Sequence, residues 1–287
     1  MKYAFIRQQS NSYSILLLCQ VLGVSTSGYY DWRFRPESNR AKTNRRLLTK
    51  IQCFHKASHG IYGSPRIHQD LLTSGEVVGI HRVARLMKRA DIQAKTARKF
   101  VITTDSKNTL APAPDYLEQN FYTQQKNQAW VSDTTFIATR QGWLYLAVVL
   151  DLFSRQVIGW AMGDKNNRQL VIDALTMAVW RRGKTRDVIV HSDQGSTYAS
   201  GDYRQLLIDN GLIGSMSRKG ECLDNAVAES FFGTLKTEWV DHQDYRTKQQ
   251  AKQSLFEYIE VFYNRQRRHS YLGYLSPVEF ERLYASQ

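Results

Sequence analysis

The order of apolar segments in the second half of this chain most constrains its fold. Three strand-like runs follow residue 128, AWVSDTTFIAT, GWLYLAVVLDLFSR and QVIGWAMG, with joins too short to hold a helix. Such joins favour antiparallel neighbours. Next come a helix of about 167–182, the strand DVIVHS, a helix near 201–210, the strand LIGSM, and a helix that Asp224 can cap and that continues to about Trp239. This order predicts an α/β domain around a mixed sheet.

Basic residues are concentrated in the first part of the chain. The sequence has 39 Lys and Arg against 26 Asp and Glu, a net charge of +13. Residues 1–120 hold 19 basic and 8 acidic residues, whereas residues 121–287 hold 20 and 18. A basic excess of this size favours a polyanionic partner such as nucleic acid. We therefore expect the N-terminal part to bind the polyanion and the later part to be an enzyme body.

The N-terminal part has the pattern of two small helical units. Residues 13–33 combine an apolar helical stretch, a break at Gly23 and a second helix that Ser25 can cap, which is helix-turn-helix spacing. A second unit has helices over 42–57 and from Pro65 onward. A polar stretch containing APAP then favours an extended connector. The expected organisation is a helix-turn-helix over 1–38, a second helical DNA-binding domain over 39–102, a linker over 103–127, the α/β core over 128–243, and a C-terminal helix with a basic tail over 244–287.

Several basic clusters are candidates for contact with DNA phosphates. Apolar residues between Val83 and Ala90 are spaced for the buried stripe of a helix, which leaves its basic residues on the outer faces. The alternatives are a helical hairpin that buries the aromatic residues near Arg33, a solvated basic face, and a solvated loop around Arg218. The candidates are Arg33, Arg35, Arg82, Arg85, Lys88, Arg89, Arg218, Lys219, Arg265, Arg267, Arg268 and His269.

The sequence argues against a disulfide framework, a zinc site and a membrane protein. Its three cysteines lie far apart, with no CxxC pair. His55 and His59 can share a helix face near Cys53, but a fourth ligand at metal-like spacing is missing, so surface histidines are the simpler interpretation. The early apolar run is too short to span a membrane, and no cleavage site follows it. We expect a soluble cytoplasmic protein without a membrane partner.

Three acidic residues stand out by their local sequence. Asp133 interrupts a strand whose neighbours are apolar or β-branched, a position that disfavours Asp. Asp193 follows the carboxyl end of a buried strand, where α/β sheets place their sites. Glu229 lies one turn into a helix, and Lys236 projects from the same helix face. Between them Gly233 lacks a side chain, so a substrate can approach there. If the two strands are neighbours, the carboxylates converge.

A cluster of three carboxylates without His or Cys suits a hard divalent cation. Mg²⁺ or Mn²⁺ is bound by such oxygen ligands and takes its remaining ligands from water and phosphate. Two ions can activate an attacking oxygen and stabilise a leaving oxygen in a displacement at phosphorus. The alternative for each acid alone is a capped or ion-paired structural residue. The three together predict a site for two Mg²⁺ or Mn²⁺ ions held by Asp133, Asp193 and Glu229.

At these residues the chain resembles the second-frame (OrfB) transposases of the insertion-sequence-3 family, whose catalytic domain is similar to that of retroviral integrases. Asp193 and Glu229 have 35 residues between them, the spacing that names the Asp, Asp, 35, Glu subgroup. The resemblance continues through HGIYGSPRI, GWLYLAVVLDLFSR, HSDQGS, SMSRKGECLDNAVAESFFGTLK and YNRQRRHSYLGYLSPVEF and covers nearly the whole chain.

The resemblance implies an RNase H-like core in which Asp133 bridges two metal ions, Asp193 completes one site and Glu229 the other. Lys236 corresponds to a lysine that contacts terminal DNA in related integrases. The implied activity is that of a bacterial DNA transposase: cleavage exposes a 3′-hydroxyl at the element end, and that hydroxyl attacks another phosphodiester. The implied partners are double-stranded DNA with terminal inverted repeats, target DNA, further copies of this chain in a homo-oligomer, and the upstream-frame (OrfA) product as a fusion or partner.

Two residues near the triad have other interpretations, and two other functions stay open. Asp151 is expected to form an ion pair with Arg155, and His191 to pack or hydrogen-bond near the site. A structure-selective nuclease would only hydrolyse DNA, so joined products distinguish it from a transposase. A non-catalytic DNA-binding regulator would inhibit a full-length transposase, and the intact triad argues against it.

Overall fold

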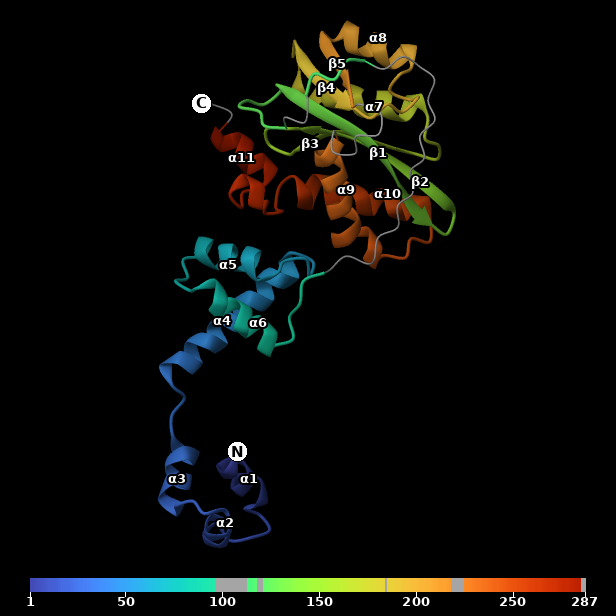
Figure 1. Cartoon of the computed structure of the whole chain (residues 1–287). Helices are drawn as coiled ribbons and strands as arrows, with labels where there is room; N and C mark the ends of the chain where they lie inside the picture. Colours follow the sequence, from blue (N-terminus) through green and yellow to red (C-terminus); the bar gives the residue numbers. More distant parts are fainter. Residues whose placement is uncertain (96–112, 118–120, 184, 218–224, 285–287) are drawn as a thin grey trace.

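The protein consists of two helical units followed by an α/β core against which the C-terminal helices pack (Figure 1). This arrangement confirms the predicted fold class, an integrase-like mixed-sheet core preceded by helices. No helix in the described part of the chain is both long and apolar enough to cross a bilayer. The computed structural model describes residues 1–95, 113–117, 121–183, 185–217 and 225–284.

The N-terminal unit has three short helices around a small apolar cluster. Between the second and third, Gly23 has a φ of 60°, the left-handed conformation that ends a helix. Ser25 caps the third helix by accepting a hydrogen bond from the Gly28 N–H at 3.1 Å, as predicted. The first helix was not predicted, because Ile6 is its one buried residue and gives no periodic pattern. The helices are α1 (Lys2–Gln9), α2 (Ile15–Leu22) and α3 (Thr26–Phe34).

The second helical unit also has three helices. The first begins before the predicted start because Ser38 accepts a hydrogen bond from the Ala41 N–H. Pro65 lies in the first turn of the second helix, as predicted. The third buries Val83, Leu86 and Met87 and leaves Arg85, Lys88 and Arg89 exposed. The helices are α4 (Asn39–Ala57), α5 (Ser64–Thr73) and α6 (Ile80–Arg89).

The core contains one five-stranded sheet in the order β3-β2-β1-β4-β5. The first three strands form the predicted antiparallel meander. The fourth pairs in parallel with the first, and the fifth in parallel with the fourth, because a helix precedes each of them and returns the chain to the same edge. The strands are β1 (Ala129–Thr139), β2 (Gly142–Asp151), β3 (Val157–Gly163), β4 (Val188–Ser192) and β5 (Leu212–Met216).

Helices cover both faces of the sheet (Figure 1). One face carries α7 (Arg168–Arg182) and α8 (Gly201–Asp209), which pack with Trp130 and Val190 in one apolar cluster. The opposite face carries α9 (Ala226–Glu238) and α10 (Lys248–Phe256). Residues of the second helical unit, among them Ile51 and Val83, belong to this second cluster. The second helical unit and the core therefore share one continuous apolar interior.

The chain ends in two helical segments beyond α10. A π-helical segment, Glu257–Tyr263, continues directly from α10, and α11 (Pro277–Tyr284) follows after a turn. Four residues of the π-helical segment are buried, among them Tyr258 and Phe262. These aromatic rings pack on the Trp239 ring just after α9. The C-terminal segment thereby braces the helix that carries Glu229.

Candidate active site

The parallel pairing of β1 with β4 brings Asp133 and Asp193 side by side. The last residues of this pairing are Ser132 and Ser192, and each aspartate is the next residue in the chain, Asp133 inside β1 and Asp193 just after β4. Asp133 lies on the α9 side of the sheet, because its antiparallel partner Val148 belongs to the apolar cluster beneath α9. The predicted convergence depended on these two strands being neighbours, and the pairing of β1 with β4 meets that condition.

Glu229 reaches the same region from α9, which contacts β1. The helix buries an apolar stripe of Ala228, Phe231 and Leu235 and leaves Glu229 and Gly233 exposed. A Cβ added to Gly233 would meet no protein atom within 4 Å, so this part of the helix surface is open. Asn225 stands at the N-cap position without a side-chain cap bond, and the predicted cap Asp224 lies outside the described residues.

The pKa of Asp133 is affected by the charges of the other two acids of the triad. Burial, followed by the charges of Asp193 and Glu229, raises the pKa of Asp133 to about 8, although a hydrogen bond from the Thr134 N–H opposes the shift. Lys236 lies close enough to lower it, and burial in turn lowers the pKa of Lys236. A divalent cation bound beside such a carboxyl group would favour its deprotonated form.

Desolvation also raises the pKa of the two outer carboxylates. Burial raises the pKa of Asp193, although a hydrogen bond from the Gly195 N–H at 2.9 Å opposes the shift. Burial also raises the pKa of Glu229. In the described part of the chain, no three His, Cys, Asp or Glu side chains are gathered tightly enough to hold a metal ion by themselves. The three acids therefore interact electrostatically but do not form a closed set of metal ligands in the described structure. Their all-oxygen donor set fits Mg²⁺ or Mn²⁺ and leaves room for ligands from phosphate.

The zinc site considered for the first histidines is absent from the described residues. The His55 Nε2 atom lies 3.0 Å from the Gln93 carbonyl oxygen, within hydrogen-bond distance. His59 packs its ring edge-on against Trp239, at 4.9 Å between centroids. Cys53 is exposed and has neither histidine as a metal partner. His55 thus makes a contact within the second helical unit, and His59 contacts the core.

Hydroxyl groups that the sequence reasoning did not single out support the ends of β1 and β4. The Ser132 hydroxyl donates to the Val148 carbonyl and lies 3.1 Å from the Tyr198 hydroxyl. Tyr198 is buried, and burial together with the charge of Asp133 holds its pKa well above the usual value. On the next strand the His191 Nδ1 lies 2.9 Å from the Ser215 hydroxyl. His191 thus hydrogen-bonds beside the site, one of the two outcomes expected for it.

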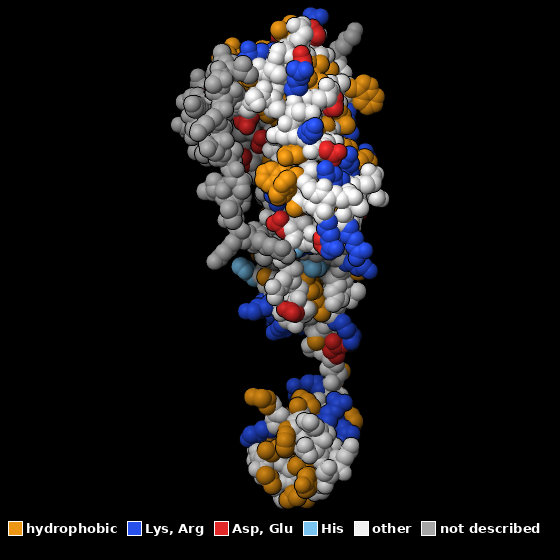
Figure 2. Space-filling model, turned by 90° about the vertical axis from the view of Figure 1, so that its right-hand side faces the viewer, with side chains coloured by type: hydrophobic (Ala, Val, Ile, Leu, Met, Phe, Trp, Pro, Cys, Tyr) orange, Lys and Arg blue, Asp and Glu red, His pale blue; other side chains and the backbone are white. Residues whose placement is uncertain are grey.

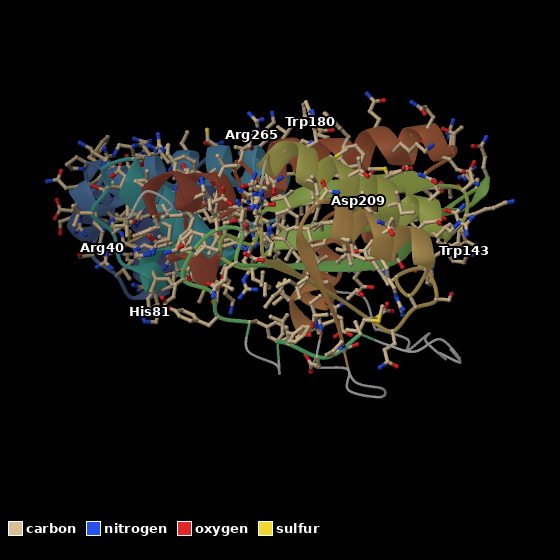
Figure 3. The ribbon with its side chains drawn as sticks, turned by 90° about the horizontal axis from the view of Figure 1, so that it is seen from above. Arg40, His81, Trp143, Trp180, Asp209 and Arg265 are labelled. Atoms are coloured by element: carbon tan, nitrogen blue, oxygen red, sulfur yellow. The ribbon has the colours of Figure 1, made fainter. Side chains whose placement is uncertain are left out.

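The candidate DNA contacts on α6 form part of a cavity of about 260 Å³ between α4 and α6. Arg82 donates to the Asn44 side chain at 2.8 and 2.9 Å, which leaves Arg85 and Arg89 with exposed guanidinium groups. Three arginines of α6, Arg82, Arg85 and Arg89, line this cavity together with a fourth, Arg40. The sequence reasoning missed Arg40 because it lies more than 40 residues away on α4. Figure 2 shows Lys and Arg side chains gathered around this part of the molecule. Figure 3 places Arg40 and His81 together at one end and Trp143 at the other.

The remaining basic candidates lie in different environments. Arg33 and Arg35 are exposed in the N-terminal unit, and Arg33 lies over the Phe34 ring at 5.7 Å. The Lys236 ammonium group lies over the Phe136 ring at 5.3 Å, beside the triad. Arg218 and Lys219 lie outside the described residues.

The predicted phosphate track in the C-terminal basic run is wrong for Arg267. This arginine is buried and forms an ion pair with Glu238 of α9 at 2.7 Å. Arg268 pairs with Asp70 of α5 at 2.6 Å, and its contact with DNA stays a prediction. Arg265 is exposed and points outward (Figure 3).

The predicted ion pair between Asp151 and Arg155 is also wrong. Asp151 is fully buried and pairs with Arg182 of α7 at 3.2 Å. Its other hydrogen bonds come from the N–H groups of Asn127 and Phe153, both at 2.9 Å. The Arg155 guanidinium group instead lies over the Tyr271 ring at 4.4 Å. The nearest cation along the chain was not the nearest in space.

Sequence comparison places this architecture among known proteins. Residues 123–222 and 229–283 match models of the integrase core domain, and residues 42–100 match a model of an HTH-like domain. The chain is 42% identical over 283 residues, 98% of each chain, to the transposase InsF of insertion sequence IS3A from Escherichia coli. The chain belongs to the IS3 family of transposases. It is also 43% identical over 267 residues, 93% of this chain and 98% of the relative, to a 31 kDa protein of insertion element IS600 from Shigella sonnei.

Family membership makes this chain a transposase with an integrase core. Asp133 and Asp193 lie within the first core match, and the second begins at Glu229. The HTH-like match contains the arginines of α6 and shows that the second helical unit is an HTH-like domain. Among solved structures, the integrase catalytic core domain of HTLV-2 in complex with magnesium is 16% identical, with a TM-score of 0.42 over 54% of this chain and 97% of that chain.

Proposed function

We propose that this transposase cleaves DNA at the ends of an insertion sequence and joins the resulting 3′-hydroxyl to a new phosphodiester through Asp133, Asp193 and Glu229. The observation that carries the proposal is geometric: β1, β4 and α9 bring Asp133, Asp193 and Glu229 to one region of the core. There burial and the charges of the other two acids raise the pKa of Asp133, and bound divalent cations would offset this concentration of negative charge. The same three residues would hold two Mg²⁺ or Mn²⁺ ions.

The bound cations would activate the attacking oxygen and stabilise the leaving oxygen. The protein's own contribution is placement. The middle of β1, the residue after β4 and the helix α9 present the carboxylates, and Lys236 offers a positive charge to a phosphate beside them. In the joining step the 3′-hydroxyl oxygen forms a bond to phosphorus as the existing ester bond to phosphorus breaks, and the attacking hydroxyl's proton passes to the leaving 3′-oxygen through solvent. The exposed surface at Gly233 leaves space for the DNA strand.

DNA binding is assigned to the helical units. The arginine cup of Arg40, Arg82, Arg85 and Arg89 is concave and nearly free of acids, which suits a backbone phosphate. Lys88, Arg33, Arg35 and Arg265 are exposed and extend the proposed contact surface, to which Arg218 and Lys219 remain predicted additions. Action as a homo-oligomer on DNA, and a fusion or partnership with the upstream-frame (OrfA) product, are further parts of the proposal.

The test is a strand-joining assay with duplexes of the element ends in Mg²⁺ or Mn²⁺. We expect Asp133→Asn, Asp193→Asn and Glu229→Gln each to lower the joining rate by at least about 100-fold, because each removes one of the carboxylates that the cations require. DNA affinity should stay within about twofold, since the arginine cup is untouched. The matched control is Asp209→Asn, an exposed acid at the end of α8 (Figure 3), which should join normally.

The outcome also separates the competing functions. Nicked but never joined products from the wild-type chain would indicate a nuclease. Binding without any cleavage in either cation would indicate a regulator. Joining that survives in all three carboxylate variants would refute the assignment of the triad.

A further inference from the structure

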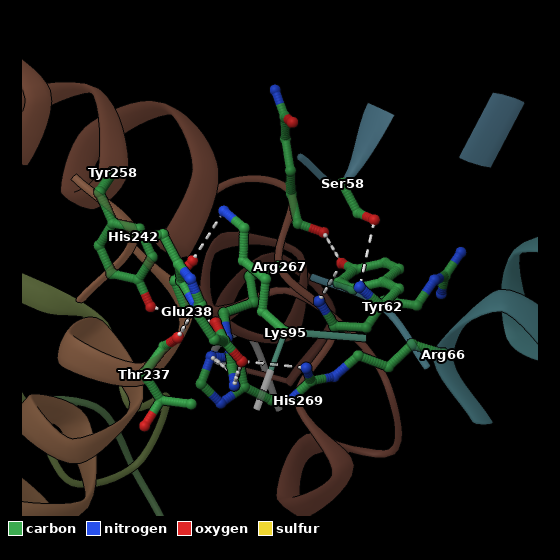
Figure 4. Close-up of polar contacts among 12 residues, drawn as sticks. Ser58, Tyr62, Arg66, Lys95, Thr237, Glu238, His242, Tyr258, Arg267 and His269 are labelled. Atoms are coloured by element: carbon green, nitrogen blue, oxygen red, sulfur yellow. Dashed lines mark hydrogen bonds and ion pairs between the residues drawn. The ribbon is translucent and has the colours of Figure 1, made fainter. Parts of the chain in front are cut away.

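A buried group of charged residues links the second helical unit to the end of α9 (Figure 4). Its centre is Glu238, a carboxylate that is 7% exposed. Arg267 donates two hydrogen bonds to it, both at 2.7 Å, from the C-terminal segment. Arg66 of α5 donates a third at 3.1 Å, and the Tyr258 hydroxyl a fourth at 3.2 Å. One carboxylate thus joins three separate parts of the chain.

A second set of contacts surrounds this group. The Lys95 ammonium group donates to the Glu238 carbonyl at 3.2 Å and lies over the Trp239 ring. The Tyr62 hydroxyl donates to the Gln266 carbonyl and accepts from the Arg268 N–H at 2.8 Å. These bonds come from the second helical unit and end on α9 or on the C-terminal segment. The junction is therefore a specific docking contact as well as an apolar one.

Glu238 is ionised at this junction. Burial by itself would raise the pKa of Glu238, but the hydrogen bonds and charges of Arg267 and Arg66 outweigh it and leave that pKa below its usual value. Burial beside Arg267 lowers the pKa of His269 to about 2, so His269 is neutral and accepts from Arg267 at 3.1 Å. Two cations share one anion, and a neutral ring accepts a bond from Arg267.

Stability alone is a weak reason for such a junction. A buried ion pair gains little over well-packed apolar residues of the same volume, because desolvation offsets the Coulomb attraction. Its advantage is geometric, since a two-pronged arginine contact fixes distance and orientation together. The same helix carries Glu229 nine residues earlier. At 1.5 Å and 100° per residue, that separation is about 13.5 Å along the axis and about half a turn around it.

We propose that the clamp formed by Arg66, Glu238 and Arg267 is a positioning device that holds α9 against the second helical unit, so that DNA bound there determines where Glu229 stands relative to Asp133 and Asp193. This inference rests on the proposed function. It explains why the three acids of the triad interact electrostatically but do not form a closed set of metal ligands in the described structure. None of the three clamp residues touches the reacting atoms, so they act through α9.

The test compares Arg66→Met with Arg46→Met in the full-length chain. Arg46 is a matched control, because it lies in the same helical unit and pairs with Glu76 at the surface, with its side chain 61% exposed. Arg66→Met removes the helical unit's bond to the Glu238 carboxylate but leaves Arg267 paired with that carboxylate, so the fold is retained. Arg66→Lys serves as the conservative rescue.

Two readouts are needed. The first is the joining rate at saturating DNA, with the affinity for the same DNA measured separately. The second is the distribution of distances between spin labels on Cys53 of α4 and on Gln249→Cys of α10, with Cys19 and Cys222 replaced by alanine. The second readout reports the docking of the helical unit on the core and does not depend on catalysis.

For Arg66→Met we expect DNA affinity within about twofold of wild type, a joining rate at least about tenfold lower, and a broader distance distribution; Arg66→Lys should recover part of both losses. Arg46→Met should match wild type throughout. An unchanged joining rate or an unchanged distance distribution in Arg66→Met would overturn the clamp. If wild type and Arg46→Met join no DNA, the proposed function fails, and the distance distributions still decide whether the clamp holds the two units together.

Discussion

At the scale of single residues, buried charges decide the stability of the core. Asp151 is fully buried and depends on Arg182, which also pairs with Glu281 of α11. We predict that Arg182→Met lowers the free energy of unfolding by about 3–5 kcal/mol, because it leaves a buried carboxylate without its cation. Arg155→Met should cost about 1 kcal/mol, the value of its contact with the Tyr271 ring. Chemical denaturation of both variants measures the difference, and equal losses would restore Arg155 as the partner.

The residue scale is also where reading the sequence was least reliable. A charge four positions away is the natural partner to choose from a sequence, yet the partner of Asp151 is 31 positions away on α7. The same difficulty applies to Arg267 and Arg268, which look like free surface charges because their acids, Glu238 and Asp70, are distant in the chain. Local sequence supplies the charges, but tertiary packing determines which of them meet.

At the scale of elements, one glycine sets the distance between α7 and the sheet. A Cβ on Gly159 of β3 would lie 2.2 Å from the Ala174 carbonyl oxygen and 2.8 Å from the Ala178 backbone nitrogen. Gly159→Ala should therefore push α7 away from the sheet and destabilise the protein by about 1–3 kcal/mol. Gly233→Ala, on the open surface of α9, should instead stabilise it by about 1 kcal/mol through helix propensity. Thermal unfolding should move in opposite directions for the two, and a common direction would contradict this packing.

Most elements of the core were predictable for a physical reason. A strand buried on one or both faces needs a continuous or alternating apolar run, and each such run after residue 128 became a strand. The helix α1 escaped prediction because a helix with a single buried residue has no periodic stripe. The convergence of Asp133 and Asp193 followed from strand order, whereas Tyr198 beneath them required knowledge of a contact 66 positions away.

At the scale of the whole molecule, charge is segregated from chemistry. The basic excess lies in the helical units and the acids of the triad lie on the core, so the DNA substrate of the proposed function would extend from one part to the other. The junction around Glu238 connects the two parts through the helix that carries Glu229. Such long-range organisation is invisible in local patterns, because it depends on how separately folding units dock.

This segregation predicts how affinity depends on salt. Each DNA phosphate neutralised by an arginine releases counterions and adds roughly 0.9 to the slope of log affinity against log salt concentration. The double variant Arg85→Gln with Arg89→Gln should bind element-end DNA more weakly and lower that slope by about 1–2, because both guanidinium groups line the α4–α6 cavity. Arg186→Gln, an exposed arginine just before β4, should leave the slope unchanged. Fluorescence anisotropy between about 50 and 200 mM salt measures both, and equal slopes would mean that the phosphates are held elsewhere on the molecule.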